Sequence, residues 1–140
     1  MEKLLHTPEG VRDIYDNECK KKRKVLSKMH HVLSLYSYND IETPTFEFFD
    51  IFNQDKGSAA SNEMYKFFDR DNNTLVLRPD ITPSIARCVA KYYNEEDLPI
   101  RLCYQGDTFL NTHNHQGKSH QITQLGAELI NDDSSAADAE

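Results

Sequence analysis

Two strand candidates that follow one another with no helical segment between them constrain this fold most. Residues 100–109 and 121–130 both have the pattern of strands, and the residues between them, 110–120, are polar and turn-like. Strands that succeed one another directly favour an antiparallel or mixed α+β sheet, whereas a doubly wound parallel sheet alternates strands with helices. The sequence therefore predicts an α+β fold.

A long amphipathic helix is predicted before this sheet, from about Asn17 to Tyr36. Its apolar residues recur at steps of three and four, which indicates one apolar stripe made of Val25, Leu26, Met29, Val32, Leu33 and Tyr36. Five consecutive basic residues, 20–24, lie in the first half of the helix. Because a helix spreads five residues around its whole girth, a solvated surface is favoured over a specific anionic contact.

The middle of the chain reads as short strands and one further helix. A strand is expected at 40–42, ended by Pro44, and then an aromatic cluster that suits core or subunit-interface packing, made of Phe46, Phe48, Phe49, Ile51 and Phe52. Residues 53–63 are small and polar and predict a mobile loop. The runs 64–69 and 74–78 flank a turn and predict a hairpin. A helix should then open with Thr82 as N-cap and Pro83 as its first residue.

Composition narrows the class of protein. The 140 residues include 16 basic and 23 acidic side chains, a net charge of −7, and 38% are hydrophobic, which supplies the core of one ordinary domain. No apolar run is long enough to span a membrane, and no signal peptide is recognisable. The acidity argues mildly against a dedicated nucleic-acid coat. Three scattered cysteines, Cys19, Cys88 and Cys103, indicate free thiols in a reducing cytoplasm.

The last residues predict a helix that is cut short. A capping sequence at 131–135 precedes the good helix formers of 136–140, and the chain stops there. An isolated helix of five residues has no stability of its own. We therefore expect this chain to be a fragment, or a domain cut from a longer protein.

Common catalytic motifs are missing from the sequence. The glycines are too scattered for a phosphate-binding loop or a dinucleotide fingerprint, and neither GxSxG nor HExxH occurs. Three histidines, His113, His115 and His120, share one loop and could bind zinc. With no thiol adjacent and the nearest carboxylates at Asp107 and Glu128, a polar, pH-sensitive loop is favoured over a metal site.

Two polar groupings carry more information. Asp80 and Thr82 lie at the mouth of a helix, where they could receive an ammonium group or merely cap the helix, and capping is favoured for Thr82. In a strand, Gln124, Gly126 and Glu128 share one face, which presents an amide, bare backbone and a carboxylate. A polar pocket and an exposed strand face would both look like this.

Three motifs together resemble those of a known family. They are Pro8-Glu9-Gly10-Val11-Arg12-Asp13, Leu77-Arg78-Pro79-Asp80-Ile81-Thr82 and Gln124-Leu125-Gly126-Ala127-Glu128. Nearly the whole chain resembles the N-terminal part of the catalytic domain of the class II histidyl-tRNA synthetase family, and more closely its paralogues, the regulatory subunits of ATP phosphoribosyltransferase. No one of the motifs would suffice alone.

The resemblance implies a fold, a pocket and a boundary. The fold would be a class II synthetase-like antiparallel sheet flanked by helices, truncated here, with residues 1–140 as its N-terminal part and the remainder missing. The first helix and the strand after it would form a homodimer interface. Asp80, Thr82, Gln124 and Glu128 match synthetase positions of the histidine pocket, and further pocket residues would come from downstream.

One departure from the family pattern bears on catalysis. Synthetase motif 2 reads Gly-x-x-Phe-Arg-x-Glu, whereas this chain has Leu110 at the Arg position and Thr112 at the Glu position. Arginine offers a charged, bidentate fork to a phosphate, and leucine cannot replace it. The loss should remove roughly 3 kcal/mol or more of transition-state stabilisation. Asp107, expected near the site of a triphosphate, points the same way.

The resemblance therefore implies a cytoplasmic, non-catalytic regulatory subunit rather than an enzyme. Its partner would be the short-form catalytic subunit of ATP phosphoribosyltransferase in histidine biosynthesis, with L-histidine as a ligand and no cofactor, metal, membrane or nucleic acid. The net charge of −7 suits a paralogue that holds no tRNA. Two alternatives stay open: an active histidyl-tRNA synthetase, and a synthetase-like dimerisation module with an empty pocket.

Overall fold

The computed structural model describes residues 5–53, 59–94, 99–112 and 119–140. Its centre is a three-stranded sheet in the order β1-β5-β6, built from β1 (Asn39–Asp40), β5 (Ile100–Phe109) and β6 (Gln121–Ile130). β5 and β6 pair antiparallel along their whole length, from Ile100 opposite Ile130 to Phe109 opposite Gln121. The short β1 runs parallel to β5, so the sheet is mixed, as the succession of strands predicts.

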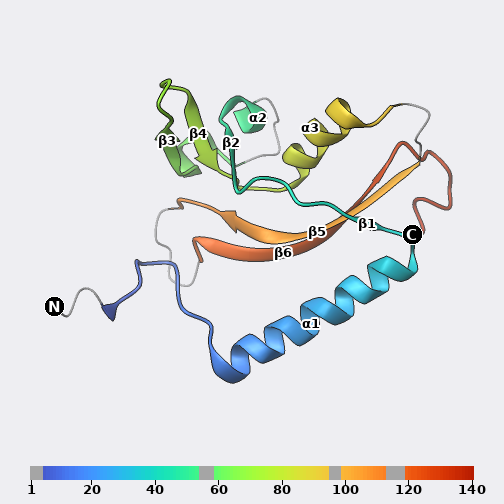
Figure 1. The fold of residues 1–140 in the computed structure, drawn as a ribbon, viewed down its shortest axis with the longest axis horizontal. Coiled ribbons are helices and arrows are strands. Elements are labelled where there is room, and N and C mark those ends of the chain that lie inside the picture. The colour runs from blue at the N-terminus through green and yellow to red at the C-terminus, as the bar shows by residue number, and fades with distance from the viewer. Residues whose placement is uncertain (1–4, 54–58, 95–98, 113–118) are drawn as a thin grey trace.

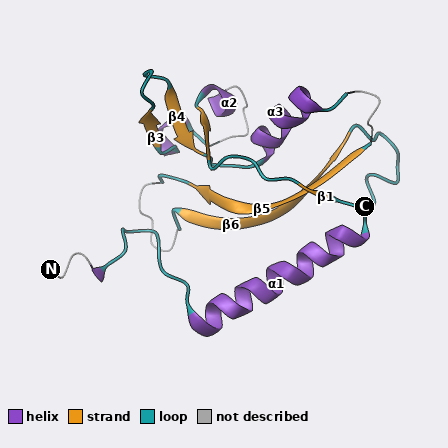
Figure 2. Cartoon of the chain, in the orientation of Figure 1, coloured by secondary structure: helices purple, strands orange, loops and turns teal. Residues whose placement is uncertain are grey.

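Helices lie against both faces of this sheet. The long α1 (Asp16–Leu35) runs below β5 and β6, and α3 (Thr82–Tyr92) lies above them (Figures 1 and 2). The α3 face is tightly packed, since Ile81, Ile85, Ile100 and Leu102 are all at most 5% exposed. The opposite layer is different, because no residue of α1 is buried.

The apolar stripe predicted for α1 does not become core. Leu26 and Leu33 are half-buried, but the other four members, Val25, Met29, Val32 and Tyr36, are each about half exposed or more, between 48% and 57%. The side of the helix toward the sheet includes Leu26 and also Lys22, which donates a hydrogen bond to Thr123 of β6. Most of the stripe therefore contacts solvent in the part of the chain that the structure describes.

A second small sheet packs beside α3. It has the order β2-β4-β3, from β2 (Phe46–Phe48), β4 (Thr74–Leu77) and β3 (Lys66–Phe68), all antiparallel. The predicted hairpin is thus confirmed. Its core includes Phe52 of α2 (Asp50–Asn53), Met64 and Val76, while Phe46 and Phe48 stay more than half exposed.

Three local expectations differ from the structure. The first strand occupies Asn39–Asp40 rather than 40–42, because its pairing follows the register of β5. In the predicted mobile loop, residues 54–58 lie outside the described residues, and Ser61–Glu63 form one 3-10 turn. The tail at 134–139 forms turns rather than a helix, and the carboxylate of Glu140 pairs with Arg101 of β5. Among the described helices, none is long and apolar enough to cross a membrane.

Candidate functional site

The start of α3 and the middle of β6 meet on the packed face of the central sheet. Thr82, the first residue of α3, donates a hydrogen bond from Oγ1 to Oε1 of Glu128, with 2.7 Å between the two oxygens. Glu128 lies opposite Leu102 of β5, whose side chain is in the core beneath α3. Two of the four predicted histidine-pocket residues are therefore in direct contact, although 46 positions separate them.

The capping prediction for Thr82 is wrong. The N-cap residue of α3 is Ile81, and no side chain caps the helix. The hydroxyl of Thr82 is already committed to Glu128, which explains why it does not bond the helix backbone. Pro83 is consequently the second residue of the helix rather than the first, though it still lies in the first turn. The nearby Asp80 accepts a hydrogen bond from the backbone N–H of Ile81 at 2.7 Å, so part of its capacity is used locally.

The face of β6 predicted from alternation is present. Gln124, Gly126 and Glu128 lie opposite Gly106, Tyr104 and Leu102 of β5, respectively. None of the described residues hydrogen-bonds the amide of Gln124, which is half-buried. Thr82 and Glu128 line a hollow of ≈ 300 Å³ with apolar residues of α3, but Asp80 and Gln124 do not line it. The four predicted residues thus form one contacting pair and two flanking groups.

Tyr104 is a member of this site that sequence reasoning missed. A Cβ built on Gly126 would lie 2.5 Å from the hydroxyl oxygen of Tyr104, so the ring occupies the space that glycine leaves. Burial raises the pKa of the Tyr104 hydroxyl, with a further rise from the carboxylates of Glu128 and Asp80 and an opposing effect from Thr82. A phenol is therefore held protonated beside two carboxylates. The available signal was the bare glycine directly opposite a tyrosine.

Arg78 is the second missed member, although it lies within a motif that was singled out. Its guanidinium is buried, lies against Gly106, and donates to the backbone carbonyl oxygens of Asp107 and Thr43, each at 2.8 Å. Burial lowers the pKa of Arg78, since the charged form loses hydration. Arg78 thereby joins β4, β5 and the segment before β2, and a side chain at position 106 would displace it.

The motif 2 positions lie just beyond the end of β5. Leu110 is half-buried, and its N–H donates to the carbonyl of His120 at 3.0 Å. Thr112 is also half-buried. Neither side chain carries a positive charge, so these two positions offer nothing to balance the charge of a phosphate.

Asp107, which was expected near the site of a triphosphate, hydrogen-bonds to residues of β6. Its carboxylate accepts hydrogen bonds from Thr123 and Gln121, and Thr123 in turn contacts Lys22 of α1. Gly106, the preceding residue, faces Arg78 and Ile81 on the α3 side. Since neighbouring residues of a strand point to opposite faces, Asp107 lies on the α1 side of the sheet, away from the predicted pocket.

The histidine-rich loop is only partly described. His113 and His115 lie outside the described residues. His120 has structural contacts: Nδ1 is 2.9 Å from the hydroxyl of Tyr65, and its backbone N–H donates to Gly10. Its Nε2 is buried without a partner among the described atoms. This ring ties the N-terminal segment to the hairpin β3-β4.

Comparison with known proteins agrees with the geometry. Residues 10–140 match the family model described as histidyl-tRNA synthetase. The chain belongs to the histidyl-tRNA synthetase family. The fold and the three motifs that resembled this family are thereby explained as shared ancestry, and the class II synthetase-like architecture is confirmed.

Curated relatives of the chain carry two names. An "ATP phosphoribosyltransferase regulatory subunit" of Clostridium novyi (strain NT) is 43% identical over 141 residues, covering 100% of this chain and 34% of the relative. A "Histidine--tRNA ligase" of Methanospirillum hungatei is 34% identical over 137 residues, covering 98% and 34%. The chain spans about a third of the length of the curated relatives it matches.

Solved structures give the same result. A structure from Bacillus halodurans C, described as an ATP phosphoribosyltransferase regulatory subunit/histidyl-tRNA synthetase, aligns with a TM-score of 0.84 at 36% identity, covering 96% of this chain and 35% of that one. Apo histidyl-tRNA synthetase of S. aureus aligns with a TM-score of 0.79 at 29% identity, covering 96% and 31%. The chain therefore corresponds to one part of a larger class II fold.

Proposed function

We propose that this chain is part of a non-catalytic regulatory subunit of ATP phosphoribosyltransferase, acting in the cytoplasm. The observation that carries the proposal is the pairing of a retained polar site with a lost catalytic position. Thr82 and Glu128 are in contact, and no described residue hydrogen-bonds the amide of Gln124. Leu110 is the residue that the family resemblance matches to the synthetase arginine. Ligand recognition without adenylate chemistry is what a sensor subunit requires.

The proposed ligand of the retained site is L-histidine. Two carboxylates, Asp80 and Glu128, suit its ammonium group or its imidazole, and Gln124 adds both a donor and an acceptor. The hollow beside Thr82 is lined mainly by apolar side chains of α3, which would exclude water from one side of a ligand. Residues downstream of position 140 would complete the pocket, as the family resemblance implies.

The proposed partners are a short-form catalytic phosphoribosyltransferase subunit and a second copy of this chain. The exposed apolar stripe of α1, with Val25, Met29 and Val32 about half exposed, supports self-association because such a surface is costly to leave in water. Histidine feedback would require different histidine affinities in two states of the assembly.

Rescue of catalysis is the decisive test. The full-length protein should co-purify with a short-form catalytic subunit and restore its phosphoribosyltransferase activity, and histidine should inhibit the reconstituted complex. The same preparation should not catalyse histidine-dependent ATP–pyrophosphate exchange. Robust exchange without any rescue would favour the active synthetase instead, and would contradict the reading of Leu110.

Variants of the polar site separate sensing from assembly. Glu128→Gln and Asp80→Asn should weaken histidine binding by about tenfold or more, since a charge-assisted hydrogen bond contributes roughly 1.5–3 kcal/mol. Asp71→Asn, an exposed carboxylate in the hairpin turn, is the matched control and should bind histidine normally. Calorimetry gives the affinities. If the wild-type complex and every variant complex form and are active, but none responds to histidine, then the protein activates its partner without sensing histidine, and the pocket is empty.

A further inference from the structure

A second cluster of chemistry-bearing side chains lies on the opposite face of the central sheet. His30 of α1, Asp40 of β1 and Cys103 of β5 bring a ring nitrogen, a carboxylate oxygen and a sulfur within 4.8 Å of one another. The Nε2 of His30 is 2.6 Å from Oδ1 of Asp40, and the Sγ of Cys103 is 3.5 Å from that same oxygen. None of these residues belongs to the proposed histidine pocket.

The fold brings these three residues together by two independent pairings. Asp40 and Cys103 are register partners in the parallel pair β1-β5, so they lie side by side. A backbone hydrogen bond from Ile41 to the carbonyl of Cys103, at 2.9 Å, holds that register. His30 comes from the second half of α1, which passes beneath the end of the sheet where β1 lies (Figure 1). Three separate elements therefore converge on one point.

We propose that His30, Asp40 and Cys103 form a zinc-binding site that clamps α1 onto the central sheet. Imidazole, thiolate and carboxylate are the donors that zinc uses in proteins. This site is independent of the proposed regulatory function. Sequence reasoning did not reach it, because the three residues are scattered through the chain and form no recognisable motif.

The distances suit zinc after small side-chain movements. With Zn–N near about 2.0 Å and Zn–S near about 2.3 Å, a tetrahedral ion would hold the nitrogen and sulfur about 3.5 Å apart. The ion would also take the place of the direct hydrogen bond between His30 and Asp40, whose 2.6 Å contact must open to about 3.3 Å. Both changes require rotation of side chains with room to move. The side chains of His30 and Asp40 are 41% and 73% exposed, so they can move, while Cys103, 1% exposed, stays fixed.

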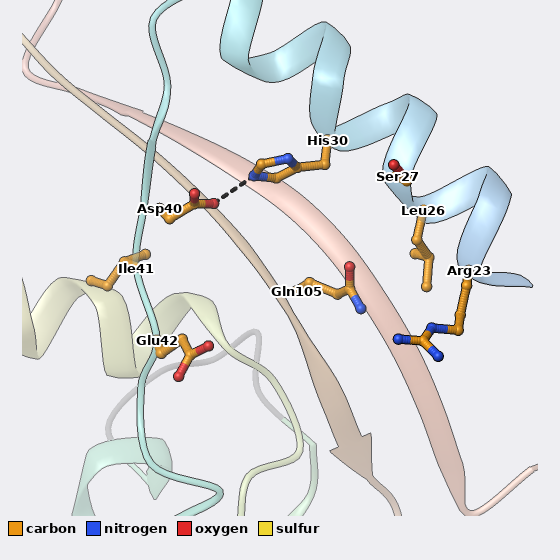
Figure 3. Close-up of a pocket in the computed structure, with 8 residues that line it drawn as sticks. All are labelled: Arg23, Leu26, Ser27, His30, Asp40, Ile41, Glu42 and Gln105. Atoms are coloured by element: carbon orange, nitrogen blue, oxygen red, sulfur yellow. Dashed lines mark hydrogen bonds and ion pairs between the residues drawn. The ribbon is translucent and has the colours of Figure 1, made fainter.

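An open position for a fourth ligand is present beside the cluster. His30 and Asp40 line a hollow of ≈ 560 Å³ between α1 and the sheet, and their hydrogen bond lies at one end of it (Figure 3). Arg23 and Gln105 line its other end. A water molecule from this hollow could complete the tetrahedron, as in zinc sites with three protein ligands.

Zinc binding here must release a proton. Burial raises the pKa of the Cys103 thiol, and the hydrogen bond to Asp40 and the charge of Asp40 raise it further. The metal-free thiol is therefore protonated at neutral pH. The incoming ion forms the zinc–sulfur bond as the sulfur–hydrogen bond breaks, and the proton leaves to solvent, so zinc affinity should increase with pH.

Titration of the metal-free protein with zinc tests the site directly. After treatment with a chelator, the protein should bind one Zn²⁺ per chain in competition with a chromophoric chelator, and its melting temperature should rise with zinc concentration. Co²⁺ should bind with a thiolate-to-cobalt charge-transfer band in the near ultraviolet. That band reports sulfur coordination, which a merely hydrogen-bonded cluster cannot produce.

Substitutions assign the ligands. Cys103→Ser, His30→Ala and Asp40→Asn should each weaken zinc binding by about 100-fold or more, since losing even an outer partner of a ligand costs about 10–100-fold. Cys103→Ser should also abolish the cobalt charge-transfer band. The matched controls are Cys19→Ser, Cys88→Ser and His31→Ala, which alter the same residue types elsewhere and should bind zinc normally. Circular dichroism in chelator verifies that each variant folds.

Two results would overturn the proposal. One is zinc affinity that is unchanged in Cys103→Ser and His30→Ala but lost in a His113→Ala/His115→Ala variant, which would move the metal to the loop. The other is the absence of saturable zinc binding by the wild-type protein at neutral and mildly alkaline pH. The three residues would then only hydrogen-bond to one another, without binding a metal.

Discussion

The two faces of the central sheet are built differently. Above β5 and β6, Ile81 and Ile85 are nearly inaccessible to solvent, and their packing positions Thr82 against Glu128. Below them, α1 has no buried residue: Leu26 and Leu33 are only half-buried, and Lys22 donates a hydrogen bond to Thr123. Dense apolar packing thus holds one layer, whereas half-buried side chains and a polar contact hold the other, and each layer should respond to mutation accordingly.

The largest effect is expected on the packed face. Ile85→Ala removes a side chain that is 1% exposed and should lower the free energy of unfolding by about 2–5 kcal/mol, from lost transfer energy and a residual cavity. Urea denaturation measures the change. Val25→Ala on α1, where the side chain is 55% exposed, is the control and should change stability by about 0.5 kcal/mol or less at concentrations where the protein is monomeric. Equal losses of unfolding free energy in the two variants would show that the two faces of the sheet are packed alike.

An intermediate effect is expected where Tyr104 lies over Gly126. Gly126→Ala would place a methyl group 2.5 Å from the tyrosine hydroxyl oxygen, so the ring must move, at a cost of about 1–3 kcal/mol for overpacking. The same substitution in a Tyr104→Ala background should cost clearly less. A double-mutant cycle from denaturation curves gives the coupling. Additive costs would mean that the two residues do not compete for space.

A smaller effect is expected from the polar contact between α1 and β6. Lys22→Ala removes the hydrogen bond to Thr123 and should lower the free energy of unfolding by about 1 kcal/mol or less, because an exposed or half-buried lysine contact contributes little. Hydrogen exchange should show faster opening of α1 with unchanged protection of β5. A loss of protection across both elements would mean that α1 and the sheet unfold together.

The smallest effect is expected on the pKa of Asp40 in β1, which contacts His30 of α1. A hydrogen bond from His30, with a weaker one from Cys103, lowers the pKa of the Asp40 carboxyl. In metal-free His30→Ala the pKa should return toward the ordinary value of about 3.9, which carboxyl chemical shifts can follow by NMR.

The lowered pKa of Asp40 also makes the free energy of unfolding depend on pH. Because the folded pKa of Asp40 lies below the unfolded value, its contribution to stability is present above about pH 4 and is lost as the pH falls through the folded pKa. His30→Ala should therefore narrow the difference in stability between neutral and acidic pH. A wild-type-like acid profile in this variant would show that His30 does not hold the carboxylate.

Local sequence pattern was sufficient for most elements but not for their environment. The long helix, the hairpin and both long strands are present where periodicity and turn residues place them. Val25, Met29 and Val32 nevertheless stay exposed, because periodicity identifies an apolar stripe without saying what covers it. The tail forms turns rather than the expected helix, and Glu140 pairs with Arg101 of β5.

The candidate site shows the same division. The alternation of β6 predicts that Gln124 and Glu128 share a face, and the family motifs include Thr82. The role of Tyr104 depends on the register that sets it opposite Gly126, and the role of Arg78 depends on the packing that brings its guanidinium against Gly106, so local pattern reveals neither. Asp107 lies on the α1 side because neighbouring strand residues point to opposite faces, and the register then sets it beside Thr123.

By itself, the sequence determined the order of elements, the family, and the absence of an arginine at position 110, since these depend only on local pattern and residue identity. The tertiary structure alone decided which groups meet across long separations. Thr82 reaches Glu128 on one face, and His30 reaches Asp40 and Cys103 on the other. The reason is that strand register and helix placement result from packing of the whole chain, and side-chain chemistry acts only over a few ångströms.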